Sequence, residues 1–251
     1  MKIIISITSY GAEHKKFLTR ILEHYAAFFS DCDLFYALCV NYPFAAPAQI
    51  PSACVEFIPP DPALVRRDFT WNNKPFLQKH FSEYDFIIET DDDILVPRAA
   101  VDYYATASVA MPPAMIPGWL CAETDPKGND HLISMNRFEI DLQTSSVAGI
   151  TPHNLHSAAF IADTSRYSVV ADQITPVTTR GYCKAQASRT LIFATLQKVI
   201  PAANIRDKSA LIYHLPRKYY PRWDVCATRH ADYIKTLPVD NSMQKSESEA
   251  S

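Results

Sequence analysis

The sequence of 251 residues has only five glycines, and none of them forms the glycine-rich loop that holds nucleotide phosphates in P-loop or dinucleotide-binding proteins. CxxC pairs and zinc-type His/Cys spacings are absent, so the six cysteines are expected to be free thiols in a reducing compartment. No apolar run reaches the roughly 18 residues that span a bilayer. We therefore expect a cytoplasmic protein, although attachment to a membrane face through a partner or a lipid-linked acceptor stays open.

The charge balance also excludes a class of partner. A formal net charge of -3 leaves no broad basic surface, which argues against nucleic acid as a partner. Hydrophobic residues make up 48% of the chain, enough for a substantial core.

Strand and helix patterns alternate along the first half of the chain. Strands are predicted at 3–8, 34–40, 54–58 and 84–90, and helices at 17–29, from about 72, and at 99–110. Further on, we expect strands at 157–162 and 210–214, a helix at 185–199, and a hairpin or two short strands within 132–142. This order predicts an α/β fold with a mostly parallel central sheet flanked by helices.

Three consecutive carboxylates, Asp91, Asp92 and Asp93, follow a buried strand. Their repulsion and desolvation need compensation, and a divalent cation that prefers oxygen ligands provides it. On an extended backbone Asp91 and Asp93 point to the same side, which would give a cation two carboxylates. The alternative is an exposed acidic turn or a helix N-cap.

The segment from Phe86 to Ile94 resembles the DxD motif of GT-A (Rossmann-like) nucleotide-sugar glycosyltransferases, and its Glu-Thr-Asp-Asp-Asp-Ile wording is similar to the exostosin-like members. The resemblance implies one glycosyltransferase domain at 1–240, with a nucleotide-sugar-binding half at 1–110, an acceptor half at 111–240 and a disordered tail at 241–251. It implies transfer of a sugar from a nucleoside-diphosphate sugar, such as a UDP-sugar, to a saccharide or glycolipid acceptor. Such a reaction belongs to polysaccharide or glycoconjugate synthesis.

The resemblance also assigns roles to single residues. Asp93 would bind Mn²⁺ or Mg²⁺, Asp91 the ribose and the metal, and His214 would complete the metal shell, while Asp92 would approach the donor sugar. The remaining donor contacts would come from residues before and after the acidic strand: Thr8, Ser9, Tyr10, Arg66, Lys74, Arg217 and Lys218. An ordinary turn at 8–10, a solvated pair at Arg66 and Lys74, and a structural histidine are the alternatives.

The catalytic base is the weakest part of the resemblance. The acidic pair that inverting members carry at the start of a late helix is missing at 181–186, where no Asp or Glu stands. Asp92, Asp163, Asp172 and Glu123 are the candidate catalytic carboxylates, and the exostosin-like wording favours retention. For the acceptor, Trp119 or the histidines at 153 and 156 are candidates. A nucleotidyltransferase acting on sugar phosphates and an inactive carbohydrate-binding relative remain the competing readings.

Overall fold

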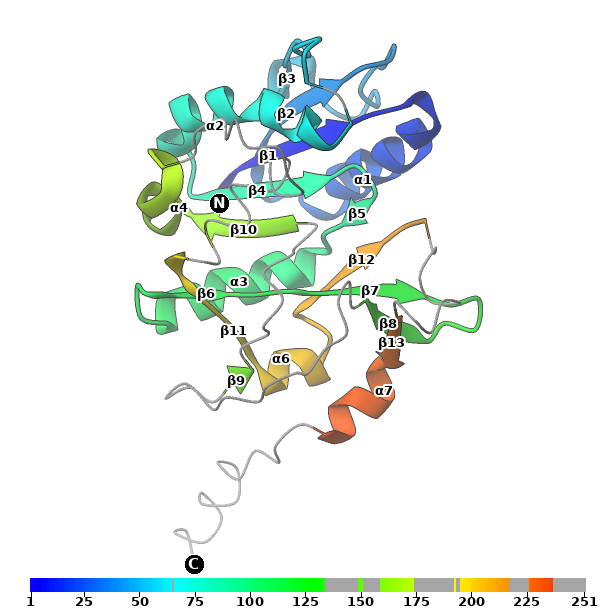
Figure 1. The fold of residues 1–251 in the computed structure, drawn as a ribbon, viewed down its shortest axis with the longest axis vertical. Helices are drawn as coiled ribbons and strands as arrows, with labels where there is room; N and C mark the ends of the chain where they lie inside the picture. The colour runs from blue at the N-terminus through cyan, green and yellow to red at the C-terminus, as the bar shows by residue number, and fades with distance from the viewer. Residues whose placement is uncertain are drawn as a thin grey trace, which may run out of the picture.

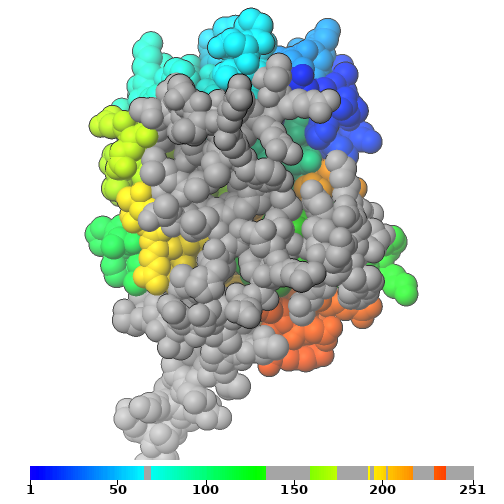
Figure 2. Space-filling model, viewed as in Figure 1, coloured from blue at the N-terminus to red at the C-terminus, as the bar shows by residue number. Residues whose placement is uncertain are grey.

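The computed structural model describes residues 1–64, 66–133, 149–150, 159–173, 192, 195–216 and 226–236. Within these ranges the chain forms three sheets with helices around and between them (Figure 1). Figure 2 shows the N-terminal strands and helices, in blue and cyan, at one end of the molecule, and α7, in orange, toward the other.

The first sheet has five strands in the order β10-β4-β1-β2-β3. All neighbouring strands run parallel except β10, which pairs with β4 in the antiparallel sense. Its strands are β1 (Lys2–Ser9), β2 (Asp33–Val40), β3 (Val55–Phe57), β4 (Phe86–Asp91) and β10 (Ala159–Asp163). β1 and β4 are buried along nearly their whole length because helices cover both faces of the sheet.

One face of this sheet is covered by α1 (Lys15–Phe28), whose buried residues recur at helical spacing: Leu18, Ile21, Leu22 and Tyr25. The other face is covered by the 3₁₀ segment η3 (Arg66–Asn73) and α2 (Lys74–His80), with Pro75 in the first turn of α2. Asn73 joins η3 to the sheet, since its Nδ2 donates to Ser6 Oγ at 3.0 Å and to the carbonyl of Ala37 at 3.1 Å.

The other two sheets are mixed. One has the order β13-β8-β7-β12-β5 and the other β6-β11-β9. Their strands are β5 (Ile94–Leu95), β6 (Met115–Pro117), β7 (Leu120–Thr124), β8 (Asp130–Ile133), β9 (Gly149–Ile150), β11 (Gln197–Pro201), β12 (Leu211–His214) and β13 (Cys226–Arg229). The remaining short helices are η1 (Ala12–His14), η2 (Ser52–Cys54), η4 (Phe81–Glu83), α6 (Ala202–Arg206), α7 (His230–Tyr233) and η6 (Ile234–Thr236).

Helix α3 (Arg98–Ala110) lies between the first sheet and the mixed sheets, and α4 (Thr164–Ala171) follows β10 (Figure 1). Trp119 Nε1 donates to the carbonyl of Ala100 at 3.1 Å and ties α3 to the chain before β7. The side chain of Arg166 in α4 is buried, and it donates to carbonyls at the end of α3, those of Ser108 at 3.0 Å and Met111 at 3.1 Å. The buried apolar residues form one continuous core through these elements.

The predicted α/β architecture with a mostly parallel central sheet is confirmed, and its four parallel strands lie within two residues of the predicted ranges. The helix predicted at 185–199 is wrong at its end, because residues 197–199 belong to β11. Val199 and Ile200 are buried there, and their run of apolar residues fits a strand as well as a helix. None of the helices in the described ranges has the length and apolar character that a membrane span requires.

Candidate active site

The chain changes direction across the first sheet between β1 and β4. From β1 it proceeds to β2 and β3 on one side, and it then returns to form β4 on the other side of β1. In open α/β sheets, ligands bind outside the carboxyl ends of the strands at such a switch point. Ser9 ends β1 and Asp91 ends β4, with Thr8 and Asp91 side by side in the register. The acidic triplet therefore begins at the place where this topology favours a ligand site.

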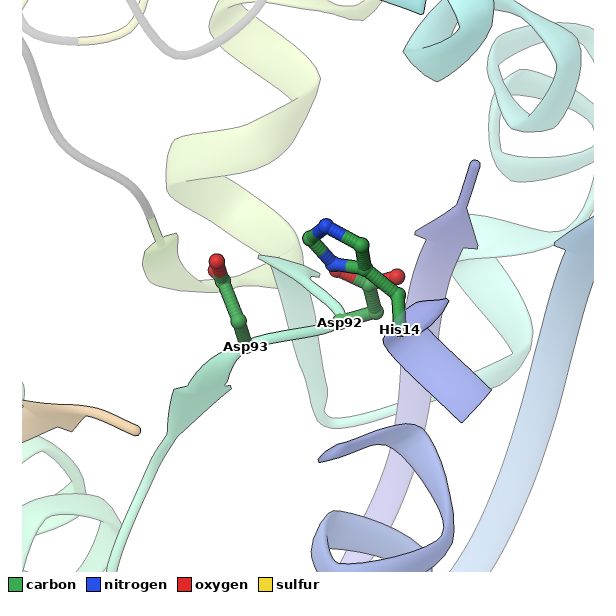
Figure 3. Close-up of side chains that lie close together, drawn as sticks. All are labelled: His14, Asp92 and Asp93. Carbon is green, nitrogen blue, oxygen red and sulfur yellow. The ribbon is translucent and has the colours of Figure 1, made fainter. Parts of the chain in front are cut away.

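The chain turns directly after Asp91, and Asp92 and Asp93 form the turn between β4 and β5. Together with His14 they offer metal-ligand atoms that all lie within 4.8 Å of one another. In Figure 3 the imidazole of His14 stands beside the carboxylate of Asp92, and Asp93 points in the same general direction. The prediction that Asp91 and Asp93 face the same ligand assumed an extended backbone through all three residues. Because the backbone turns at Asp92 and Asp93, the potential metal ligands that lie close together are Asp92, Asp93 and His14.

Asp92 is 5% exposed and both of its carboxylate oxygens are hydrogen-bonded. His14 Nδ1 lies 2.9 Å from Oδ1, and the hydroxyl of Ser9 donates to Oδ2. Ser9 Oγ is also 2.5 Å from the hydroxyl of Tyr42. Burial raises the pKa of the Asp92 carboxyl, and the bonds from His14 and Ser9 offset only part of that rise. The contact with Asp92 thus fixes the position of the His14 ring.

Asp93 is contacted from the second sheet. His214, the last residue of β12, places Nε2 3.4 Å from Asp93 Oδ2 and Nδ1 2.5 Å from Glu123 Oε1. The side chain of Glu123 is fully buried. Burial alone would lower the pKa of His214, but the hydrogen bonds and charges of Asp93 and Glu123 outweigh it and raise the pKa to about 9. The two carboxylates therefore stabilise the charged form of the imidazole.

A partly open hollow with a volume of about 220 Å³ lies next to His214. It is lined by Arg20, Leu95, Thr124, Tyr213, His214 and Leu215. Leu95 and Tyr213 are paired neighbours in adjacent strands, and the hollow therefore opens where β5 meets β12. His214 lines this hollow and also contacts Asp93, so the hollow lies beside the group of His14, Asp92 and Asp93.

No family model matches this chain, and no curated protein matches it either. Among solved structures the chain is similar to the crystal structure of an active-site mutant of LgtC, with 12% sequence identity and a TM-score of 0.41. The superposition covers 85% of this chain and 86% of that chain. A likeness of this degree decides nothing about activity, which has to be argued from the residues of the site.

The predicted donor-binding residues of the first strand lie at the switch point. Thr8 is buried beside Asp91, and Ser9 is fully buried against Asp92. The ring of Tyr10 meets the ring of Phe69 edge-on, with centroids 5.3 Å apart and planes at 73°. The structure thus brings Thr8, Ser9, Asp91, Asp92 and Asp93 to the same edge of the sheet, and their roles in donor and metal binding stay predictions.

Lys74 does not face a ligand. Its side chain is 3% exposed and forms an ion pair with Glu89, whose side chain is 4% exposed. The prediction that Lys74 contacts the donor diphosphate is therefore corrected: the ammonium group neutralises a carboxylate inside the protein. The side chain of Arg66, predicted for the same role, lies outside the described part.

Two of the predicted catalytic carboxylates, Asp163 and Glu123, are held in structural bonds. Asp163 pairs with Phe86 at the opposite end of β4, roughly 17 Å from Asp91 at a rise of about 3.3 Å per residue. There it caps α4 by accepting from the backbone N–H of Arg166 at 2.9 Å. Asp172 is exposed just after α4, and Glu123 is buried behind His214. Asp163 and Glu123 are thus placed for structural bonds, which corrects their assignment as a base.

The predicted acceptor platform at Trp119 is also corrected, because this side chain is 5% exposed and packs in the core. Other predicted contacts lie outside the described residues: Arg217, Lys218, His153 and His156. The segment 181–186, where the acidic pair is missing, also lies outside them. The sequence reasoning missed His14 and Tyr42. The available signal for His14 was its position five residues beyond a strand that ends at the predicted ligand edge.

Proposed function

We propose that this protein is a metal-dependent glycosyltransferase that moves a sugar from a nucleoside-diphosphate sugar to a saccharide acceptor. One observation carries the proposal: carboxylates and imidazoles gather at the switch point of a mostly parallel α/β sheet, at the end of a DxD-like segment. The resemblance of that segment supplies the class of reaction, and the geometry supplies a place for a cation and its phosphates.

The residues present fit a divalent cation. Asp93 reaches the same space as His14 and Asp92, and its other side faces Nε2 of His214 at 3.4 Å. Carboxylate and imidazole groups are ligands that Mn²⁺ accepts. Bound there, the cation would neutralise the two donor phosphates and so make the nucleoside diphosphate a better leaving group.

The protein's own groups would then do two things. Thr8, Tyr10 and Asp91 would hold the nucleoside at the ends of β1 and β4. Asp93 and His214 would fix the position of the diphosphate relative to the mixed sheet.

The acceptor is proposed to enter the hollow beside His214. Tyr213 offers an aromatic ring there, and Thr124 a hydroxyl, both of which suit a sugar. Inversion requires a carboxylate base open to the acceptor hydroxyl. Among the described candidates, Asp92 and Glu123 are buried in hydrogen bonds and Asp163 lies at the far end of β4, which leaves the exposed Asp172. Retention of configuration is therefore proposed from the exostosin-like wording of the acidic segment.

The test is release of nucleoside diphosphate from a panel of nucleotide sugars, with Mn²⁺ and a mixture of saccharide acceptors. Wild type and the control Asp102→Asn, an exposed carboxylate on α3, should release it, and Asp93→Asn should lose the activity. Release of pyrophosphate instead would identify a nucleotidyltransferase. Binding of a saccharide without either product would identify a carbohydrate-binding relative and reject the proposal.

A thermal-shift screen of the same nucleotide sugars names the nucleotide. A ligand that binds only the folded chain raises the melting temperature according to its affinity. We expect UDP-sugars to give the largest shift, and only when Mn²⁺ is present. An equal shift without metal would contradict the metal-dependent binding of the donor.

A further inference from the structure

We propose that the hollow beside His214 binds an acidic sugar, one that carries a carboxylate or a phosphate group, and that Arg20 pairs with this group. The inference rests on the proposed function, which makes the hollow the acceptor site, and it adds the chemical class of the acceptor. It assigns Arg20 as a specificity-determining residue.

Arg20 reaches the hollow from α1, whereas the other lining residues come from β5, β7, β12 and the position after β12. In Figure 1, β5 lies between α1 and β12. Helix α1 buries Ile21 and Leu22, while Arg20 is exposed. The hollow is therefore bounded by a cationic side chain on the α1 side and mainly by neutral side chains on the side of the mixed sheet.

The charge of Arg20 is left for a ligand. Within the described residues its guanidinium forms no hydrogen bond and no ion pair. Burial lowers the pKa of His24, one turn further along α1, and the positive charge of Arg20 lowers it further. The other group in the hollow that can carry a positive charge, His214, lies between the carboxylates of Asp93 and Glu123.

The neutral lining groups suit the ring and hydroxyls of a sugar. Burial, followed by the charge of Asp130, raises the pKa of Tyr213 to about 12, so its hydroxyl keeps its proton at neutral pH. Thr124 Oγ1 donates to Asp130 at 2.8 Å, which leaves the hydroxyl oxygen to accept from a sugar hydroxyl. Leu95 and Leu215 add apolar contacts.

The size of the hollow limits what enters it. Its volume of about 220 Å³ lies below the range of about 300–1,000 Å³ that is typical of pockets for drug-sized ligands. We therefore expect the hollow to hold one sugar unit rather than a length of polysaccharide.

Arginine favours anions of a particular shape. Its planar guanidinium donates two parallel hydrogen bonds to a carboxylate or a phosphate, which a neutral hydroxymethyl group cannot accept in the same way. Because Arg20 is exposed, the pair is hydrated and partly screened. The expected preference for an acidic sugar over a neutral sugar of the same shape is therefore about three- to tenfold, and it should shrink as the salt concentration rises.

The experiment measures by saturation-transfer NMR how tightly the full chain binds matched pairs of sugars. The pairs are glucuronate with glucose and galacturonate with galactose, whose members differ only in a carboxylate or a hydroxymethyl group, and glucose-6-phosphate tests the phosphate. We expect an acidic sugar to bind about three- to tenfold more tightly than its neutral partner at low salt.

Two substitutions of Arg20 and one control locate the preference. Arg20→Gln should abolish it, and Arg20→Lys should keep only a part, because lysine retains the charge but not the planar donors. The control Lys16→Gln removes another exposed cation of α1 and should keep the preference of wild type. Tighter binding of the uronates alone would identify a carboxylate as the recognised group, and tighter binding of glucose-6-phosphate alone a phosphate.

Equal binding of acidic and neutral sugars, or no binding of any of them, overturns the inference. A preference that persists in Arg20→Gln or at high salt also overturns it, and the salt series in wild type decides if that variant does not fold. So does a higher donor KM in Arg20→Gln with unchanged binding of acidic sugars, because Arg20 would then serve the donor phosphates. An Arg20-dependent preference without release of nucleoside diphosphate would reject the proposed function alone, and transfer without any such preference would reject this inference alone.

Discussion

The buried ion pair of Lys74 and Glu89 allows a test of whether Lys74 stabilises the fold or contacts the donor phosphates. The perturbation is Lys74→Met, which keeps most of the side-chain volume and removes the ammonium group. Both partners are nearly inaccessible, with side chains 3% and 4% exposed. Removing one partner leaves a buried carboxylate with less compensation, and such losses cost about 3–5 kcal/mol of stability.

Replacing both partners separates the pair from the packing. A double variant, Lys74→Met with Glu89→Leu, removes both charges, and replacing a buried ion pair by apolar groups is often neutral or stabilising. We therefore expect the double variant to recover most of the stability lost in Lys74→Met. Urea unfolding followed by circular dichroism measures both changes, with slope and midpoint analysed together.

The opposite outcome would show that the structural reasoning is wrong. If Lys74 contacted the donor phosphates, Lys74→Met would raise the KM for the donor several-fold with an unfolding free energy within about 0.5 kcal/mol of wild type, as for an ordinary surface substitution. A strongly destabilised protein that retains its donor KM supports the buried pair. The two readings therefore differ in both stability and kinetics.

Three further predictions concern the framework of the fold. Arg166→Met removes the donor of several buried carbonyl bonds at the end of α3 and should cost about 3–5 kcal/mol in urea unfolding; a loss below about 1 kcal/mol, the worth of one ordinary hydrogen bond, would contradict this. Burial would raise the pKa of Asp163, but bonds from Ser165 and Arg166 outweigh it and lower the pKa. Its stabilising effect is thus present above the unfolded-state pKa and lost as pH falls through the folded value, so Asp163→Asn should flatten the acid limb of the stability–pH curve, and an unchanged limb would refute it. A Cβ at Gly118 would lie 2.5 Å from Lys198 Cγ, so Gly118→Ala should cost about 1–3 kcal/mol by thermal unfolding, and an unaltered melting temperature would speak against this contact.

The first sheet was predictable because its strands are short apolar runs, rich in isoleucine in β1 and β4, and they are separated by turn residues and helices. The position of the site followed from the same pattern, since charged residues at the end of such a strand are rarely accidental. Ser157–Ala162 and Ala210–His214 were located for the same reason, within two residues of β10 and β12.

The parts of the site that could not be predicted depend on contacts between residues that are far apart in the sequence. Lys74 lies at the start of the helix predicted from about residue 72 and looks like a surface cation, yet it pairs with Glu89 in β4. The direction in which each aspartate side chain points depends on the turn after Asp91. The alternating pattern of a strand does not predict where that turn begins. His14 became a candidate only when folding placed it beside Asp92, which lies 78 positions away in sequence.

The two aspartates of the turn are also the whole covalent connection between β4 of the first sheet and β5 of the mixed sheet. A shift of β5 relative to β4 would act on this two-residue connection and change the distance between Asp93 and His214. A cation bound by Asp93 and His214 would link the end of β4 to β12 of the mixed sheet. Thermal unfolding of the two layers should then be more tightly coupled in the loaded protein, which calorimetry can resolve as one transition replacing a broader one.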